Sequence, residues 1–241
     1  MKKSLPFIAA AALVALALAG CSAGATGGGA GAQPPQGGSS SQNYGADDLV
    51  KILQTAEKTI GTGTISDNAT ILAKLKAAGP ISATAGLTAD GGKIVPASCG
   101  TTLDQAVTTD GKDYGVGPKG IAAELNYDKG LLTLVSVTSG SLPTGLSNKI
   151  TATLQSLYSA CSSAQAIDSG VTVGLTIKKL ALHTNADETY GYEETISASG
   201  TSTASPEVEA ISGNLLIVDV GIDGTDADAA AAVNAVLAAA K

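Results

Sequence analysis

The sequence predicts a single domain of the α+β class, an antiparallel β-sheet with helices packed mainly on one face and a helix at each end. Segments with helical periodicity open and close the region from residue 44 to residue 241. The strand patterns between them follow one another as hairpins instead of alternating with helices, as expected for an antiparallel sheet. No repeat or second linker divides these roughly 200 residues, a length that one hydrophobic core can serve.

Two helices are predicted at the start of the domain. Apolar residues recur at helical spacing after Asp47 and Asp48, which suit a helix N-terminus, and they are Leu49, Ile52, Leu53, Ala56 and Ile60. A second helix is predicted between Ser66-Asp67-Asn68 and the stop signal Gly79-Pro80, with Ile71, Leu72 and Leu75 on one side. We expect both helices to pack on the sheet.

A β-hairpin and a long helix are predicted next. Residues 121–127 alternate between apolar and other side chains, the turn Asp128-Lys129-Gly130 follows, and residues 131–138 run back as the partner strand. After Leu142-Pro143, one helical face carries Leu146, Ile150, Leu154, Leu157, Tyr158 and Cys161. Cys161 is therefore expected to point into the core.

The last third of the chain is predicted to be rich in strands. Residues 171–182, 189–198 and 214–222 carry β-branched or aromatic alternation, and Asn185-Ala186-Asp187 is expected to link the first two as a hairpin. Thr225 and Asp228 have the spacing of a capping box with Asp in place of Glu. They predict a C-terminal helix with Val233 and Leu237 facing inward.

The N-terminus has the order of a secretory signal peptide. Lys2 and Lys3 precede an apolar run over residues 7–19, which is too short to span a bilayer. The run ends in Leu18-Ala19-Gly20-Cys21, which matches the bacterial lipobox. This match implies removal of residues 1–20 and attachment of acyl chains to Cys21, and the alternative is an ordinary signal peptide cleaved near Ala23 or Ala25.

Residues 21–43 are predicted to be a flexible tether between Cys21 and a folded domain over residues 44–241. Gly, Ala, Ser, Pro and Gln make up nearly all of this segment, which holds no charge and no large apolar side chain. Such a composition cannot bury enough surface to order itself, and about 20 residues of it would reach roughly 25 Å. The protein is therefore expected at the extracytoplasmic face of a cell membrane, lipid-anchored through Cys21.

The charge and composition exclude several kinds of partner. All 14 basic residues are Lys, and removal of Lys2 and Lys3 leaves 12 positive against 21 negative side chains, a net charge of −9. We therefore expect no nucleic acid partner. The chain has no Arg, which disfavours a two-point clamp for anions, and no Trp, and its only Phe lies in the signal peptide. An aromatic stacking platform is therefore not expected either.

Cys99 and Cys161 are the cysteines left after the lipid site. An even pair in an exported chain predicts one disulfide bond in an oxidising compartment. Two free thiols or half of a metal site are the alternatives, and both lack a nearby His. Closing a loop of 62 residues would stabilise the fold by about 4 kcal/mol in the chain-entropy account.

The sequence offers no catalytic set. Residues 115–120 fit GxGxxG by letters but precede a strand, so they predict a flexible turn. Ser66-Asp67-Asn68 matches one element of the serine β-lactamases, yet no SxxK or KTG accompanies it, so a helix cap is expected. His183 is the only histidine, and neither a GxSxG elbow nor a free thiol accompanies it. We therefore predict that the protein is not an enzyme.

Two other groups of residues are candidate sites. His183, Asp187 and Glu188 could meet across a hairpin to bind a metal, but exposed turn residues explain these types better, so no metal and no cofactor are expected. Glu193 and Glu194 point to opposite faces of a strand, so they are not a carboxylate pair for glycoside chemistry. One of them near the apolar face could mark a cleft, with a strand-edge salt bridge as the alternative.

The order of elements resembles a known family. The family shows a Pro shortly before a cysteine, then a hairpin, then a helix that ends in an aromatic residue near a second cysteine, then further strands and a terminal helix. In this chain the markers of that order are Pro96, Cys99, Tyr158, Cys161 and residues 215–220. Over residues 45–240 the chain resembles the PknH-like extracellular sensor domains of mycobacterial kinases and related actinobacterial envelope lipoproteins. The resemblance implies a binding module with a cleft between sheet and helices and no known catalysis. The kinase domain is understood to have two disulfides, and no binding residue is carried over.

Three functions follow as hypotheses. The first is a non-catalytic ligand-binding or sensor lipoprotein that engages an envelope ligand or a membrane-protein partner. The second is a carrier of lipid or lipoglycan, which would need a large cavity lined by aliphatic side chains. The third is an envelope hydrolase, which would need carboxylate clusters that the linear sequence does not display.

Overall fold

The computed structural model describes residues 42–78, 92–113, 120–137, 140–168, 171–222 and 224–241. The predicted signal peptide and Cys21 lie outside these ranges, as do most of the predicted tether and residues 115–119. The helices are α1 (Ala46–Ile60), α2 (Asn68–Ala78), α3 (Ala97–Asp113), α4 (Leu146–Ala160) and α5 (Asp226–Ala239). The strands are β1 (Gly63–Ser66), β2 (Lys93–Val95), β3 (Gly120–Tyr127), β4 (Gly130–Val137), β5 (Ala164–Asp168), β6 (Val171–Lys179), β7 (Glu188–Ala198), β8 (Thr201–Ser212) and β9 (Leu215–Gly221).

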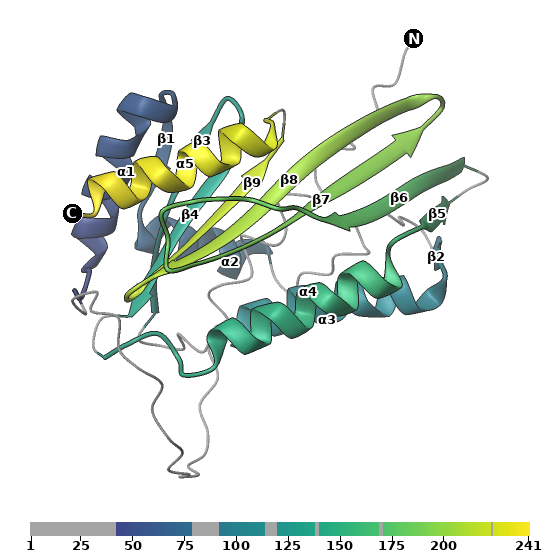
Figure 1. Ribbon diagram of the computed structural model, residues 1–241, viewed down its shortest axis with the longest axis horizontal. Coiled ribbons are helices and arrows are strands. Elements are labelled where there is room, and N and C mark those ends of the chain that lie inside the picture. The colour runs from purple at the N-terminus through teal and green to yellow at the C-terminus, as the bar shows by residue number, and fades with distance from the viewer. Residues whose placement is uncertain (1–41, 79–91, 114–119, 138–139, 169–170, 223) are drawn as a thin grey trace.

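The described strands form one antiparallel sheet in the order β1-β3-β4-β9-β8-β7-β6-β5-β2. The predicted α+β class, the single domain and the helix at each end are therefore confirmed. Short strands form both edges of the sheet, three residues in β2 and four in β1, which limits the backbone that the edges expose for pairing with other chains. The hairpin of β7 and β8 is the longest, and its tip projects past the helices (Figure 1).

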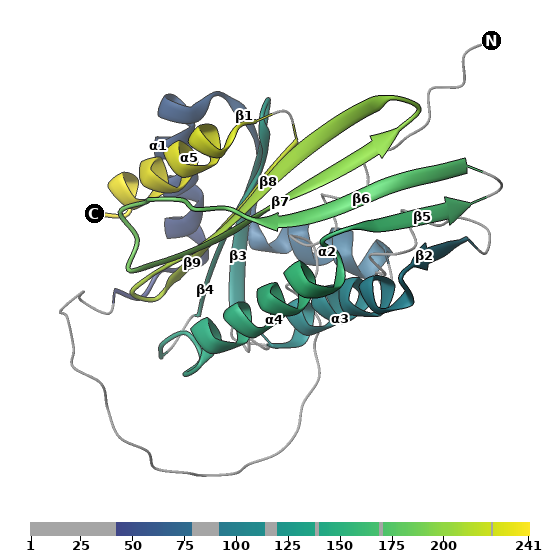
Figure 2. The ribbon, with the colours of Figure 1, turned by 45° about the vertical axis from the view of Figure 1, so that its right-hand side comes forward.

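Helices cover both faces of the sheet, with three of the described helices on one face and two on the other. Helices α1 and α5 pack on one face, and α2, α3 and α4 contribute to the core on the other (Figure 2). The reason is that the central strands bury both of their sides. In β4, Leu132 and Leu134 join the core under α1 and α5, whereas Leu131 and Val135 join the opposite core.

Most elements lie where the sequence pattern places them. Helix α1 buries Leu49, Ile52, Leu53 and Ala56, as its helical spacing predicts. The hairpin of β3 and β4, the helix α4, the strands β6, β7 and β9 and the C-terminal helix are also present. Helix α1 packs against α5, which brings the two ends of the described domain together. Among the described helices, none has the length and apolar content needed to span a membrane.

Candidate functional site

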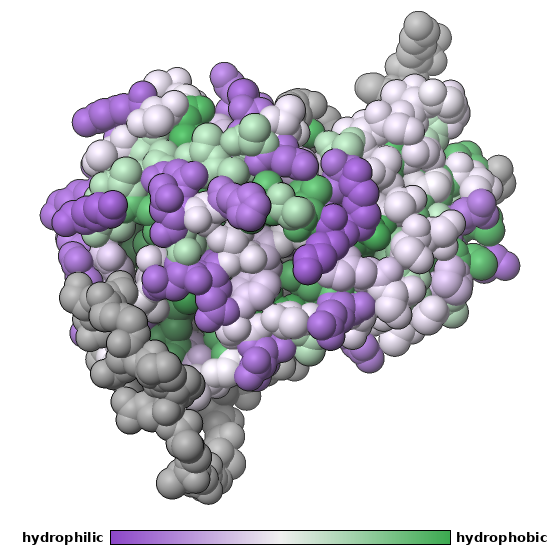
Figure 3. Space-filling view, viewed as in Figure 1, coloured by the Kyte–Doolittle hydropathy of each residue, from purple (hydrophilic) through white to green (hydrophobic). Residues whose placement is uncertain are grey.

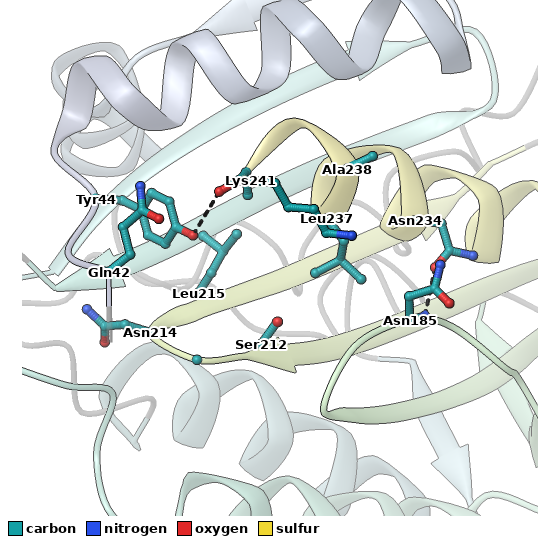
Figure 4. Close-up of a pocket in the computed structure, with 12 residues that line it drawn as sticks. Gln42, Tyr44, Asn185, Ser212, Asn214, Leu215, Asn234, Leu237, Ala238 and Lys241 are labelled. Carbon is teal, nitrogen blue, oxygen red and sulfur yellow. Dashed lines mark hydrogen bonds between the residues drawn. The ribbon is translucent and has the colours of Figure 1, made fainter. Parts of the chain in front are cut away.

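A pocket of about 340 Å³ lies between the last turns of α5 and the turn that joins β8 to β9 (Figure 4). It opens at the end of the molecule where the described chain begins, since Gln42 and Tyr44 line it. The Tyr44 hydroxyl donates to the carbonyl of Ala240 at 3.4 Å, which fastens the start of the domain to its C-terminal helix. The pocket therefore lies directly beside the predicted exit of the tether.

The wall formed by α5 is fixed by apolar packing. Its residues Ala229, Ala232, Val233, Val236 and Leu237 are buried, because small side chains let the helix lie close to the sheet and to α1. The space-filling view shows a light green, hydrophobic band along α5 with hydrophilic residues scattered around it (Figure 3). A helix held along its length gives the pocket a firm wall.

The opposite wall is a tight turn that a neighbouring loop holds in place. Gly213 takes a φ of 57°, in the left-handed region that favours glycine, between Ser212 and Asn214. Its backbone N–H donates to Asp187 Oδ2 at 2.8 Å. The backbone N–H of Asn185 donates to Asn234 Oδ1 on α5, also at 2.8 Å. The loop before β7 thus ties the turn and the helix together across the pocket.

Neutral polar groups dominate the lining of this pocket. Four carboxamides contribute to it, together with a serine, a tyrosine, four aliphatic residues, a glycine and one lysine. The lining residues are Gln42, Tyr44, Asn185, Ser212, Gly213, Asn214, Leu215, Asn234, Leu237, Ala238, Ala240 and Lys241. None of them carries a carboxylate side chain. A carboxamide offers both donors and an acceptor, so the pocket can satisfy a ligand that has both.

Several of these polar groups are uncommitted. Asn214 donates through Nδ2 to Asn43 Oδ1 at 3.1 Å, but its Oδ1 is buried and accepts no hydrogen bond from the described residues. The side chains of Gln42, Asn185 and Ser212 likewise make no hydrogen bond to another residue in the part of the chain that the structure describes. Hydrogen-bonding capacity is therefore available at both ends of the pocket.

Cys99 and Cys161 are joined in a disulfide bond, as the cysteine count predicts. Their Cα atoms lie 4.9 Å apart, and both residues are fully buried in the core shared with α3 and α4. Cys99 lies in the first turn of α3, and Cys161 ends α4 with its carbonyl accepting from Ile177 in β6 at 2.9 Å. The bond connects the two helices on the face opposite to the pocket.

The three residues of the candidate metal site do not come together. His183 is exposed, and Asp187 accepts from the turn at Gly213. Glu188 instead accepts hydrogen bonds from Ser147 in α4 and from Tyr190 in its own strand β7. No group of three metal-ligating side chains occurs among the described residues. The Glu188 contacts attach the first turn of α4 to the start of β7.

Glu193 and Glu194 lie on opposite faces of β7, as the strand period predicts. Glu193 forms an ion pair with Lys178 of the neighbouring strand at 2.6 Å, the salt bridge weighed as the alternative. Glu194 shares the face of Tyr192 and Ile196, and burial raises its pKa to about 7. The two carboxylates are therefore not a pair.

The structure also contains buried carboxylates that the sequence reading did not single out. Glu207 accepts a hydrogen bond from the Tyr192 hydroxyl at 2.5 Å. The pKa of Tyr192 is raised first by burial and then by the negative charge of Glu207. Glu124 lies 4.0 Å from Lys74 Nζ, and burial raises its pKa while Lys74 opposes the change. Glu207 and Glu124 are buried residues of strands β8 and β3, and neither of them lines the pocket.

The Ser66-Asp67-Asn68 motif serves as a helix cap, as expected. Asp67 Oδ1 accepts from the backbone N–H of Thr70 at 2.8 Å. The pKa of Asp67 is lowered first by the hydrogen bond from the Thr70 side chain and then by this backbone bond. Asn68 Oδ1 accepts from the backbone N–H of Ala122 at 3.0 Å, which joins α2 to β3. The β-lactamase reading gains no support from these contacts.

Comparison with known proteins gives similarities of fold. Neither the family models nor the curated proteins include a match to this chain. Among solved structures, the extracellular domain of PknH from Mycobacterium tuberculosis is similar at 12% identity and a TM-score of 0.44, covering 83% of this chain and 98% of that one. An uncharacterised protein from Mycobacterium smegmatis, the Rv0999 ortholog, is similar at 12% identity and a TM-score of 0.40, covering 80% and 96%. No residue role is carried over from either structure.

Proposed function

We propose that this chain is a non-catalytic, extracytoplasmic ligand-binding or sensor module, anchored to a membrane through lipid on Cys21. Its ligand site is the pocket between α5 and the turn at Gly213. The observation that carries the proposal is the meeting of a firm-walled pocket and the predicted tether at one end of the domain. Gln42, the first described residue, already lines the pocket.

Export and anchoring are supported by the chain's own chemistry. The lipobox ends at Cys21, and 20 residues separate this cysteine from the first described residue. The Cys99–Cys161 disulfide suits an oxidising compartment outside the cytoplasm. Both features support a place of action on the outer side of a membrane.

Ligand binding is supported by the size and chemistry of the pocket. Its volume of about 340 Å³ falls at the lower end of the range of small-molecule sites. Its walls are a packed helix and a tied turn, so little ordering is needed when a ligand binds. The lipid-carrier alternative gains no such support, because carboxamides line this pocket, whereas an acyl chain needs an apolar tunnel.

Anchoring is tested by replacing the lipid site. We expect Cys21→Ala, expressed in a bacterium that processes lipoproteins, to move the protein from the membrane fraction to the soluble extracytoplasmic fraction. Mass spectrometry of the N-terminal peptide should show acyl chains on Cys21 in the unsubstituted protein only. The control Ser22→Ala keeps both properties. Unchanged membrane association of a Cys21→Ala chain from which residues 1–20 have been removed would contradict the anchor. An unsubstituted protein that begins near Ala23 or Ala25 would support the alternative of an ordinary signal peptide.

Ligand binding is tested by thermal unfolding of the mature Cys21→Ala protein with fractions of an envelope extract. A ligand of the folded state raises Tm in proportion to the logarithm of its concentration over Kd. We expect one fraction to raise Tm, and the double variant Asn185→Ala/Ser212→Ala to lose this response. Asn148→Ala/Thr203→Ala is the matched control, since both of its residues are exposed and lie outside the pocket. A fraction that stabilises all three proteins equally would contradict the site.

A further inference from the structure

The charge of the pocket lining restricts the class of ligand. No carboxylate side chain lines it, so no acidic side chain offers a counter-charge to a cationic ligand. Lys241 is the only charged side chain in the lining, and the sequence contains no Arg to grip a phosphate or carboxylate at two points. The lining therefore favours a neutral ligand.

The polar groups require a ligand with many hydrogen-bonding atoms. Ser212 and the carboxamides of Gln42 and Asn185 are uncommitted among the described residues. Asn214 adds a buried acceptor without a described partner. Figure 4 shows these groups spread along the pocket, with Gln42 and Asn214 at one end and Asn185 and Asn234 at the other. Hydroxyl groups match such a lining, because each donates one hydrogen bond and accepts others.

An apolar strip runs between these polar ends. Leu237 and Ala238 project from α5, and Leu215 lies near the Tyr44 ring on the opposite side (Figure 4). A sugar ring has this two-sided character, because hydroxyl groups surround it while its C–H groups form an apolar surface. Tyr44 can contact such a surface with its ring. The contact needs only one aromatic residue, so the absence of Trp does not exclude it.

We propose that the pocket binds a neutral saccharide unit, presented either as a free sugar or as the headgroup of a glycolipid. This inference rests on the proposed ligand-binding function and narrows it to one class of ligand. The carboxamides and Ser212 bind the hydroxyl groups, and the strip of Leu215, Leu237 and Tyr44 contacts the ring. The position of the pocket beside the tether suits both sources.

The test uses the complete mature protein carrying Cys21→Ala. Saturation-transfer difference NMR is recorded with glucose, galactose, mannose and N-acetylglucosamine, one at a time. Flotation is measured with phosphatidylcholine vesicles that contain or lack glucosyl diacylglycerol. The pocket variant Asn185→Ala/Ser212→Ala and the control Asn148→Ala/Thr203→Ala are run beside it, with unfolding curves to show that all three proteins are folded.

We expect binding to one or more of these probes and about tenfold weaker binding by the pocket variant, the loss that removal of two neutral hydrogen bonds produces. Binding of free sugars identifies a soluble ligand, and binding of glycolipid vesicles alone identifies a headgroup. No binding to any probe, equal flotation with plain vesicles, or equal binding by the pocket variant would overturn the saccharide assignment. A pocket-dependent Tm shift by an envelope fraction would then leave the ligand-binding function standing with another ligand.

Discussion

Asp219 is the most deeply buried carboxylate in the part of the chain that the structure describes. It lies in β9 with no exposed surface, on the face covered by α1 and α5. Burial raises its pKa to about 7, although the Tyr127 hydroxyl, which donates to its Oδ1 at 2.9 Å, partly opposes that rise. Glu194 has a similarly raised pKa but keeps some contact with solvent. Asp219 is therefore the better residue for testing how a buried carboxylate affects stability.

Asp219 should make the stability of the domain depend on pH. Its pKa is higher in the folded state than the ordinary value near 3.8, so the folded state binds the extra proton between about pH 4 and pH 7. The free energy of unfolding should therefore fall as pH rises through this window and level off above it. Asp219→Asn should flatten the fall and be more stable than the unsubstituted protein at pH 8 by roughly 2–4 kcal/mol.

Urea unfolding at several pH values measures this effect. Asp128→Asn is the control, because Asp128 is exposed in the turn between β3 and β4. A pH dependence that is identical in the Asp219 and Asp128 variants would show that Asp219 is not the source.

The start of α5 is held by a complete capping box. Asp228 N donates to Thr225 Oγ1 at 3.3 Å, and Thr225 N donates to Asp228 Oδ2 at 3.0 Å. Lys129 Nζ donates to Asp228 Oδ1 at 2.5 Å and is the first cause that lowers the pKa of Asp228 to about 2. The cap thus attaches α5 to the turn between β3 and β4.

Thr225→Ala should lower the free energy of unfolding by about 1 kcal/mol, the usual loss for an N-cap threonine. The reason is that the backbone N–H of Asp228 loses its acceptor while the helix remains packed. Thr203→Ala, at an exposed position in β8, is the comparison in urea unfolding. If the two variants unfold at the same urea concentration, the cap does not stabilise the helix.

Helices and strands with a strong local sequence pattern were predicted correctly, and those with a weak pattern were not. The face of Leu49 and Leu53 predicted α1, and the spacing of Thr225 and Asp228 predicted α5. Strand β8 was not predicted, because its first half is rich in Ser and Thr and it contains Pro206. Its pairing with β7 and β9 decides its structure, and such long-range contacts leave no local pattern. The short strands β1, β2 and β5 were not predicted for the same reason.

The disulfide bond constrains a large part of the molecule. It closes a loop of 62 residues that contains α3, the hairpin of β3 and β4, and α4. We expect Cys99→Ala/Cys161→Ala to lower the free energy of unfolding by about 4 kcal/mol, because the unfolded chain gains freedom. Urea unfolding measures the loss. Reduction of the unsubstituted protein should give a similar loss, and a change below about 1 kcal/mol in both would contradict this account.

The candidate site was out of reach of sequence reasoning. Gln42, Asn185, Ser212 and Asn234 lie far apart in the chain and become neighbours only when α1, α5 and the turn at Gly213 assemble. Each of these residues has a type that is common in loops and turns, so no one of them marks a site. The lipobox match stays a prediction, and it could be made from the sequence because its four residues are contiguous. Local chemistry is visible in a sequence, whereas a pocket built from several distant segments is not.

The proposed lipid on Cys21 would limit how far each end of the molecule can lie from the membrane, because the hydrogen bond from Tyr44 to Ala240 places the start of the domain beside its C-terminal helix. The 21 residues from Cys21 to Ser41 can span at most about 70 Å. This length limits the distance of the pocket from the membrane, whichever way the domain turns. The tip at Ser199 and Gly200 lies at the other end of β8, roughly 40 Å farther along the strand. If Cys21 carries the proposed lipid, the uncharged Ser/Thr tip can reach roughly 40 Å farther from the membrane than the pocket can.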